Sequence, residues 1–174
     1  MRVAGIIGWH DSGKTTLVVA VVGELTKRGY AISTMKHAHH VFDVDTPGKD
    51  SWRHREAGAT QVMVGSSTRW ALMHELRDTP EPSTDELLAQ MSPVDLILIE
   101  GFKRENHRKI EVYRQGLKEA PIALEDPTVI AVATDGPIKG LPEDIDLLDI
   151  NDPSAVADYI EHHWDMKRPA GGGR

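Results

Sequence analysis

The segment Gly8-Trp9-His10-Asp11-Ser12-Gly13-Lys14-Thr15 has the residue types and the spacing that bind phosphate. Its two glycines let the backbone curl until several N–H groups converge on one anion. Lys14 then reaches the β- and γ-phosphates of a nucleotide, and the Thr15 hydroxyl ligates the Mg2+ that bridges them. The pattern predicts a nucleotide-binding loop that consists of Gly8, His10, Asp11, Ser12, Gly13, Lys14, Thr15 and Thr16.

A candidate partner for this loop is Glu100, which follows the apolar run of residues 96–99. Such a run predicts a buried strand, and an acid at its carboxyl end faces the Mg2+ of a bound nucleotide. We therefore predict that Thr15 and Glu100 hold Mg2+, and that Lys14 and Glu100 are the catalytic residues. The alternative is a buried strand that merely ends in an exposed glutamate.

Asp135 follows a further apolar run, residues 129–134, and is a candidate guanine ligand. In GTPases that have this type of loop, an aspartate after such a strand bonds the two guanine nitrogens that adenine cannot match. The fuller Asn-Lys-x-Asp sequence is absent here, so Asp135 is proposed from its position alone.

Residues 36–51 form a polar stretch with three histidines and three aspartates as possible ligands, among them His37, His39, His40, Asp45 and Asp50. They are interpreted as transition-metal ligands, as groups near Mg2+, or as a switch that senses the γ-phosphate. The alternative is a solvated loop in which Asp50 or Ser51 caps the next helix.

The stretch from Lys103 to Lys109 is basic. Lys103 and its neighbours are candidates to clamp the phosphates of the nucleotide or of a second anionic ligand. A solvated, charged loop is the alternative for this stretch, and both readings stay open.

Strands and helices alternate around these residues and predict an α/β fold with a largely parallel sheet. Strands are expected over residues 3–7, 30–35, 96–99, 110–114, 129–134 and 146–150, and helices over 14–28, 51–57, 83–91 and 154–164. Residues 60–65 and 69–74 predict a β-hairpin, and Ser83 with Glu86 predicts a capping box. A strand before the glycine-rich loop and a helix after it favour phosphate binding over a simple turn.

Length and composition fit one globular domain of 174 residues, expected over residues 1–164 with a disordered tail over 165–174. The formal net charge of −7 argues against general binding to nucleic acid or to anionic membranes. The chain has no cysteine, so neither disulfides nor thiolate metal sites are expected. No signal-peptide pattern and no membrane-spanning run is present, and we expect a cytoplasmic protein.

The chain resembles the molybdopterin-guanine dinucleotide biosynthesis protein B (MobB) family of P-loop GTP-binding proteins. The resemblance rests on the phosphate loop and on segments that follow in the same order up to residue 135. These segments are Lys36-His37-Ala38-His39-His40, Phe42-Asp43-Val44-Asp45, Pro47-Gly48-Lys49-Asp50-Ser51, Ala57-Gly58-Ala59, residues 95–103 and Lys109-Ile110-Glu111-Val112. The Lys-His-x-His-His segment and the Pro-Gly-Lys-Asp-Ser segment are more diagnostic of the family than the phosphate loop itself.

The resemblance implies a P-loop NTPase three-layer sandwich with a β-hairpin insertion. It further implies a homodimer that binds GTP with Mg2+, hydrolyses GTP slowly and serves molybdenum cofactor biosynthesis. In that role the family assists a nucleotidyltransferase, which joins GMP to molybdopterin. Lys14, Thr15 and Glu100 stand at the family's phosphate and metal positions, and Asp135 stands where the guanine-reading sequence is incomplete.

Two other functions stay open on the sequence. A P-loop small-molecule kinase shares the phosphate loop, and the basic stretch after Lys103 would then form its lid. A GTPase metallochaperone would bind Ni2+ or Zn2+ through His37, His39 and His40, although such sites often use thiolates.

Overall fold

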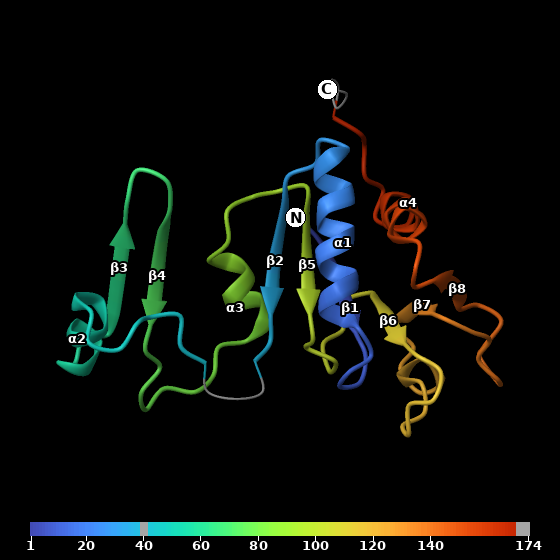
Figure 1. The fold of residues 1–174 in the computed structure, drawn as a ribbon, viewed down its shortest axis with the longest axis horizontal. Coiled ribbons are helices and arrows are strands. Elements are labelled where there is room, and N and C mark those ends of the chain that lie inside the picture. The colour runs from blue at the N-terminus through green and yellow to red at the C-terminus, as the bar shows by residue number, and fades with distance from the viewer. Residues whose placement is uncertain (39–41, 170–174) are drawn as a thin grey trace. The chain divides into compact units, whose positions relative to one another are not determined.

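The computed structural model describes residues 1–38 and 42–169 of the chain (Figure 1). The chain divides into two compact units, one formed by Met1–His37 with Met91–Arg174 and the other by Ala38–Gln90. We call the first the sheet unit and the second the insertion. Each is described by itself below.

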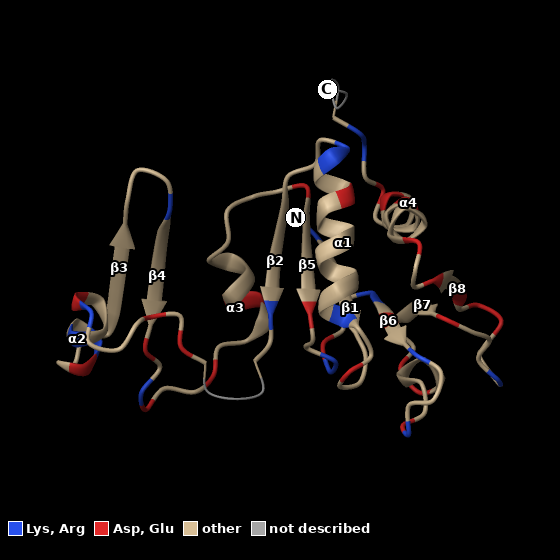
Figure 2. Cartoon of the chain, viewed as in Figure 1, with Lys and Arg blue, Asp and Glu red and all other residues tan. Residues whose placement is uncertain are grey.

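The sheet unit is built on six parallel strands in the order β2-β5-β1-β6-β7-β8. Their bounds are β1 Arg2–Ile7, β2 Ile32–Lys36, β5 Leu96–Glu100, β6 Lys109–Tyr113, β7 Val129–Thr134 and β8 Asp146–Asp149. Strands β5 and β6 flank β1, so β1 lies where the strand order reverses, and ligands of such sheets bind beside that point. Figure 2 shows a basic residue at the end of β2 and an acidic residue at the end of β5. The prediction of a parallel α/β sheet is confirmed.

Two helices cover one face of this sheet, α1 (Lys14–Lys27) and α4 (Pro153–His163). Leu17, Val21 and Ile160 are fully or almost fully buried in the core between these helices and the strands. On the other face, Ile7 and Val132 pack with Ala123 of the short 3-10 helix η1 (Ile122–Leu124). In the described part of the sheet unit, the 3-10 helix η1 covers this other face of the sheet. The sequence did not predict η1.

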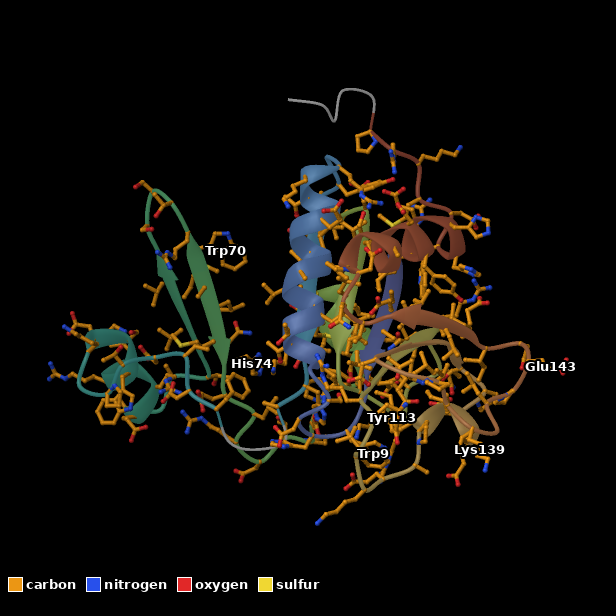
Figure 3. The ribbon with its side chains drawn as sticks, turned by 45° about the vertical axis from the view of Figure 1, so that its right-hand side comes forward. Trp9, Trp70, His74, Tyr113, Lys139 and Glu143 are labelled. Atoms are coloured by element: carbon orange, nitrogen blue, oxygen red, sulfur yellow. The ribbon has the colours of Figure 1, made fainter. Side chains whose placement is uncertain are left out.

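The insertion contains α2 (Asp50–Glu56), the hairpin strands β3 (Gln61–Gly65) and β4 (Trp70–His74), and α3 (Thr84–Ala89). The antiparallel pairing of β3 with β4 confirms the predicted hairpin. Figure 3 shows the Trp70 side chain standing out from this hairpin, and Trp70 is 65% exposed.

Helix starts in the insertion differ from one another. Helix α3 begins with the predicted capping box, in which Ser83 and Glu86 bond each other's backbone N–H groups. Helix α2 has Lys49 as its N-cap and no side-chain cap hydrogen bond. The reading in which Asp50 or Ser51 caps this helix is therefore wrong.

The extent of the domain differs from the sequence expectation of one unit over residues 1–164. A polar stretch begins near the first border of the insertion, but its residues predict a ligand-binding loop within one domain. At the other end, the Met166 N–H donates to the Glu161 carbonyl at 2.9 Å, and Arg168 lies 3.1 Å from the Glu161 carboxylate. Ordered contacts therefore extend to Arg168, within the stretch expected to be disordered. No helix in the described residues is long and apolar enough to cross a membrane.

Candidate nucleotide site

The predicted phosphate loop connects β1 to α1. Gly8 has a φ of 151°, and a Cβ there would lie 2.3 Å from the Val112 carbonyl oxygen, so the position accepts only glycine. Gly13 is the N-cap of α1 with a φ of 96°, and the helix begins with no side-chain cap and no acid in its first turn. Because the first N–H groups of a helix need an acceptor, this helix start fits a phosphate group.

Lys14 lies folded back on the loop. Its Nζ donates to the Trp9 carbonyl oxygen at 2.6 Å. Burial and then the positive charge of Lys103 lower the pKa of the Lys14 ammonium. An anion placed on the loop would reverse this electrostatic cost, as expected of a phosphate-binding lysine.

The two predicted Mg2+ ligands contact each other. The Thr15 hydroxyl donates to Glu100 Oε1 at 2.7 Å, and Glu100 is only 8% exposed. A hydroxyl and a carboxylate side by side are ligands that Mg2+ prefers in nucleotide sites. The site also contains Lys36, whose Nζ lies 2.6 Å from Glu100 Oε1 and 3.3 Å from Thr15 Oγ1. The residues present therefore fit a small cation, since an ammonium group already contacts both oxygens.

Sheet register explains the position of Lys36. Lys36 pairs with Glu100 across β2 and β5, and Ile6 pairs with Glu100 from the other side. Parallel strands end at the same edge, so the last residues of β2 and β5 meet beside the loop that follows β1. Lys36 was not among the site residues predicted from the sequence. Its place as the final residue of a strand beside the loop was the signal available.

Lys103 lies on the other side of the loop. Its Nζ is 4.1 Å from the centre of the Trp9 ring, and the Trp9 indole N–H donates to the Ala120 carbonyl at 2.8 Å. Burial lowers the pKa of the Lys103 ammonium. A cavity of about 400 Å3 adjoins these side chains, lined by Trp9, Lys103, Ala120, Pro121, Ile122, Leu124, Glu125 and Asp126. The basic stretch thus places one lysine on the loop, as the phosphate-clamp reading requires.

Asp135 follows β7, at the predicted edge of the sheet, but its carboxylate is engaged. It accepts the Gln115 N–H at 2.8 Å and lies 3.3 Å from the Arg114 guanidinium. The Gln115 hydrogen bond is the main cause that lowers the pKa of Asp135. The guanine contact of Asp135 stays a prediction, and it requires these partners to give way.

A cavity of about 230 Å3 lies along the start of α1, and Asp135 does not line it. Its lining residues are Gly13, Thr16, Leu17, Ala20, Arg114, Ile150, Asn151 and Pro153. Thr16 was predicted to contact nucleotide, whereas Arg114 and Asn151 were not proposed. Arg114 lies close to the loop, since a Cβ on Gly13 would be 3.4 Å from its Nε.

The polar stretch after β2 is split between the two units. The His37 N–H donates to the Glu100 carbonyl at 3.0 Å, and its ring centre lies 4.5 Å from that of Phe102. In the insertion, Asp45 accepts the Ser51 hydroxyl at 2.7 Å. Asp50 is exposed as the first residue of α2.

The remaining residues predicted for the site are two histidines of the polar stretch and three side chains of the phosphate loop. His39 and His40 lie outside the described residues. Among residues 1–38 and 42–169, no group of three or more His, Asp or Glu side chains is placed to hold a metal ion. In the loop, His10 and Asp11 lie 2.9 Å apart and are almost fully exposed, while Ser12 is buried.

A parallel sheet with a glycine-rich loop between its central strand and the following helix defines the P-loop NTPase-like class of fold. Within that class, the chain belongs to the MobB family: the model described as "Molybdopterin guanine dinucleotide synthesis protein B" matches residues 3–135. The resemblance seen in the sequence is confirmed.

Relatives agree with this assignment, and solved structures agree with the fold. A Haemophilus influenzae protein named "Molybdopterin-guanine dinucleotide biosynthesis adapter protein" is 44% identical over 166 residues, which cover 92% of this chain and 89% of the relative. An Escherichia coli protein of the same name is 46% identical over 163 residues, covering 92% and 91%. Bacillus subtilis MobB superposes with a TM-score of 0.71 at 20% identity, covering 97% of this chain and 100% of that structure. A Bacillus stearothermophilus MobB homologue gives 0.69 at 24%, covering 95% and 99%. These two structures support the fold.

Proposed function

We propose that the chain is a GTP-binding adapter protein of molybdenum cofactor biosynthesis, which assists the attachment of GMP to molybdopterin. The observation that carries the nucleotide part is the pairing of Thr15 with Glu100 at 2.7 Å beside the phosphate loop. The biosynthetic part rests on family membership and on the adapter names of the two relatives.

In this proposal, the loop residues bind and orient the nucleotide. The N–H groups at the start of α1 bind phosphate oxygens, and Lys14 turns from the Trp9 carbonyl to the β- and γ-phosphates. Thr15 and Glu100 would hold Mg2+, which would supply positive charge to the bound phosphates. Glu100 is thereby assigned to the metal rather than to activating water, which fits slow hydrolysis.

The partners of the proposed function are a molybdopterin guanylyltransferase and a second copy of this chain. Met63, Trp70 and Leu72 expose 42–65% of their surface on one face of the hairpin of the insertion, and Val64 is exposed on the other face. Exposed apolar patches of this kind mark protein interfaces. The apolar hairpin therefore supports the homodimer that the family resemblance implied.

Calorimetric titration with GTP, GDP and ATP in the presence of Mg2+ tests the nucleotide part. We expect GTP to bind best, Lys14→Ala to lose affinity and Asp135→Ala to erase the preference for guanine. Lys27→Ala, in the last turn of the same helix and 80% exposed, is the control and should bind like wild type. Equal binding of ATP and GTP by wild type would refute the guanine assignment.

Co-sedimentation with a purified guanylyltransferase, with and without GTP, tests the adapter part. We expect a complex that the Lys14→Ala variant forms less well in the presence of GTP. Absence of any complex under all nucleotide conditions would contradict the adapter role.

A further inference from the structure

Lys36 occupies the place between the two predicted Mg2+ ligands. Its ammonium lies 2.6 Å from Glu100 Oε1 and 3.3 Å from Thr15 Oγ1, and these two oxygens are 2.7 Å apart. The Glu100 side chain is only 11% exposed, whereas that of Lys36 is 59% exposed. The carboxylate is therefore held in place at the end of β5, and the lysine is the partner that has room to leave.

This arrangement keeps both oxygens engaged. Glu100 Oε1 accepts from the Lys36 ammonium and from the Thr15 hydroxyl at the same time. Because the Thr15 proton points at Glu100, the hydroxyl must turn before its lone pair faces a cation. A metal ion that enters has to displace the ammonium and reorient this hydroxyl.

The local charge disfavours a bare metal ion. Lys36 and Lys103 both act on the Lys14 ammonium, and the acids that act on it are Glu100 and Asp11. A free divalent cation between Glu100 and Thr15 would meet the Lys36 ammonium at contact distance, which opposes its binding. A complex of Mg2+ with a nucleoside triphosphate carries net negative charge and supplies phosphate oxygens for the displaced ammonium.

We propose that Lys36 is the specificity-determining residue that makes this site take Mg2+ together with nucleotide and reject free Mg2+. The ammonium acts as an internal cation that only the metal–nucleotide complex replaces. This inference rests on the proposed nucleotide site, and it assigns Lys36 a role that its strand position alone did not indicate.

Binding of Mn2+ alone, without nucleotide, tests the proposal by electron paramagnetic resonance on wild type, Lys36→Met and Lys36→Arg. We expect Lys36→Met to bind Mn2+ at least about tenfold more tightly, because a unit positive charge is removed within a few Å of the ion. Lys36→Arg keeps the charge and should behave like wild type. Lys27→Met removes an exposed charge at the far end of α1 and should change nothing.

Thermal unfolding gives a second readout that does not depend on activity. Loss of Lys36 leaves the poorly exposed Glu100 carboxylate without its cation, so Lys36→Met should melt at a lower temperature than wild type. Added Mg2+ should restore that melting temperature, and the double variant Lys36→Met with Glu100→Gln should not respond to Mg2+. Lys36→Gln serves in place of Lys36→Met if the latter does not fold.

The outcomes separate this inference from the proposed function. If Lys36→Met binds Mn2+ no better than wild type, or if Lys36→Arg binds it as well as Lys36→Met, the inference is overturned even when GTP binds through Lys14. If no variant binds GTP while Lys36→Met gains Mn2+ affinity, the internal cation stands and the nucleotide assignment fails.

Discussion

The sheet unit and the insertion differ in how their strands are buried. All five residues of β5 are buried, whereas β3 buries only Val62 and β4 buries none. Helix α2 likewise buries no residue, while α1 buries Leu17, Val18, Val21 and Leu25. Because burial of apolar surface dominates folding, the sheet unit carries the stability and holds the phosphate loop in place.

The insertion relies on polar contacts instead. The Arg55 guanidinium donates to Asp43 at 2.8 Å and to Glu75 at 3.0 Å. Arg77 donates to the carbonyls of Arg55 and Ala59. The Arg55 side chain is only 14% exposed, so these ion pairs are partly shielded from water, whereas a lone two-stranded hairpin is marginal in water. The insertion therefore has little buried apolar surface of its own, whereas the sheet unit has a closed apolar core.

The largest effect is expected in the sheet unit. Leu98→Ala removes a fully buried side chain from β5 and should lower the free energy of unfolding by about 2–5 kcal/mol. Urea unfolding at several protein concentrations measures this loss, which should not depend on concentration. A strong concentration dependence would show that the sheet unit also relies on association.

The next effect belongs to the hairpin. If a second copy covers it, Trp70→Ser should weaken association by about 2 kcal/mol, the size found for buried aromatic anchors of interfaces. Sedimentation equilibrium measures the dimer constant. Val19→Ser is the matched control, because Val19 is equally exposed, at 67%, on α1 of the sheet unit. An unchanged dimer in Trp70→Ser, or a monomeric wild type, would remove the hairpin as the interface.

A smaller effect is expected at the start of α3. Ser83→Ala removes the cap that accepts the Glu86 N–H and should cost about 1 kcal/mol. Hydrogen exchange should speed up in α3 and leave β5 unchanged, because the two elements belong to different units. Ser83→Thr keeps a capping hydroxyl and should exchange like wild type. Faster exchange across the whole sheet unit would show that the two units unfold together.

The smallest effect concerns pH. Burial, followed by the charge of Lys109, lowers the pKa of His107, while Glu105 and Asp126 act in the opposite direction. In the unfolded chain, His107 therefore takes up a proton near the usual histidine pKa. In the folded chain, His107 stays neutral at that pH. Its contribution to stability is present above that value and is lost as the pH falls below it.

Urea unfolding at about pH 7.5 and at about pH 5.5, on either side of the ordinary histidine pKa, measures this contribution. His107→Gln should lose part of the difference in unfolding free energy between the two conditions. An identical difference in wild type and variant would mean that other groups account for the pH dependence.

Local patterns predicted much of this molecule. A few consecutive residues are enough to predict the phosphate loop, the buried strand before Glu100 and the hairpin. The contact of Lys36 with Glu100 is set by the register of β2 on β5, which joins residues 64 positions apart. Arg114 and Gln115 are the partners of Asp135, and their contacts likewise depend on how β6 and β7 end side by side. Such pairings arise only when the sheet is assembled, so the sequence can place Lys36 at a strand end beside the loop but cannot show which carboxylate it contacts.

Trp9 gives the loop an intrinsic optical label. Its carbonyl accepts a hydrogen bond from Lys14, its indole N–H donates to the Ala120 carbonyl, and the Lys103 ammonium lies over its ring. When Lys14 moves to a phosphate, the Trp9 carbonyl loses its hydrogen bond from Lys14, and the polarity around the indole changes. The other three tryptophans lie away from this loop in sequence, at Trp52, Trp70 and Trp164. A chain in which these three are replaced by phenylalanine would report ligand arrival through fluorescence of the loop itself, without any attached dye.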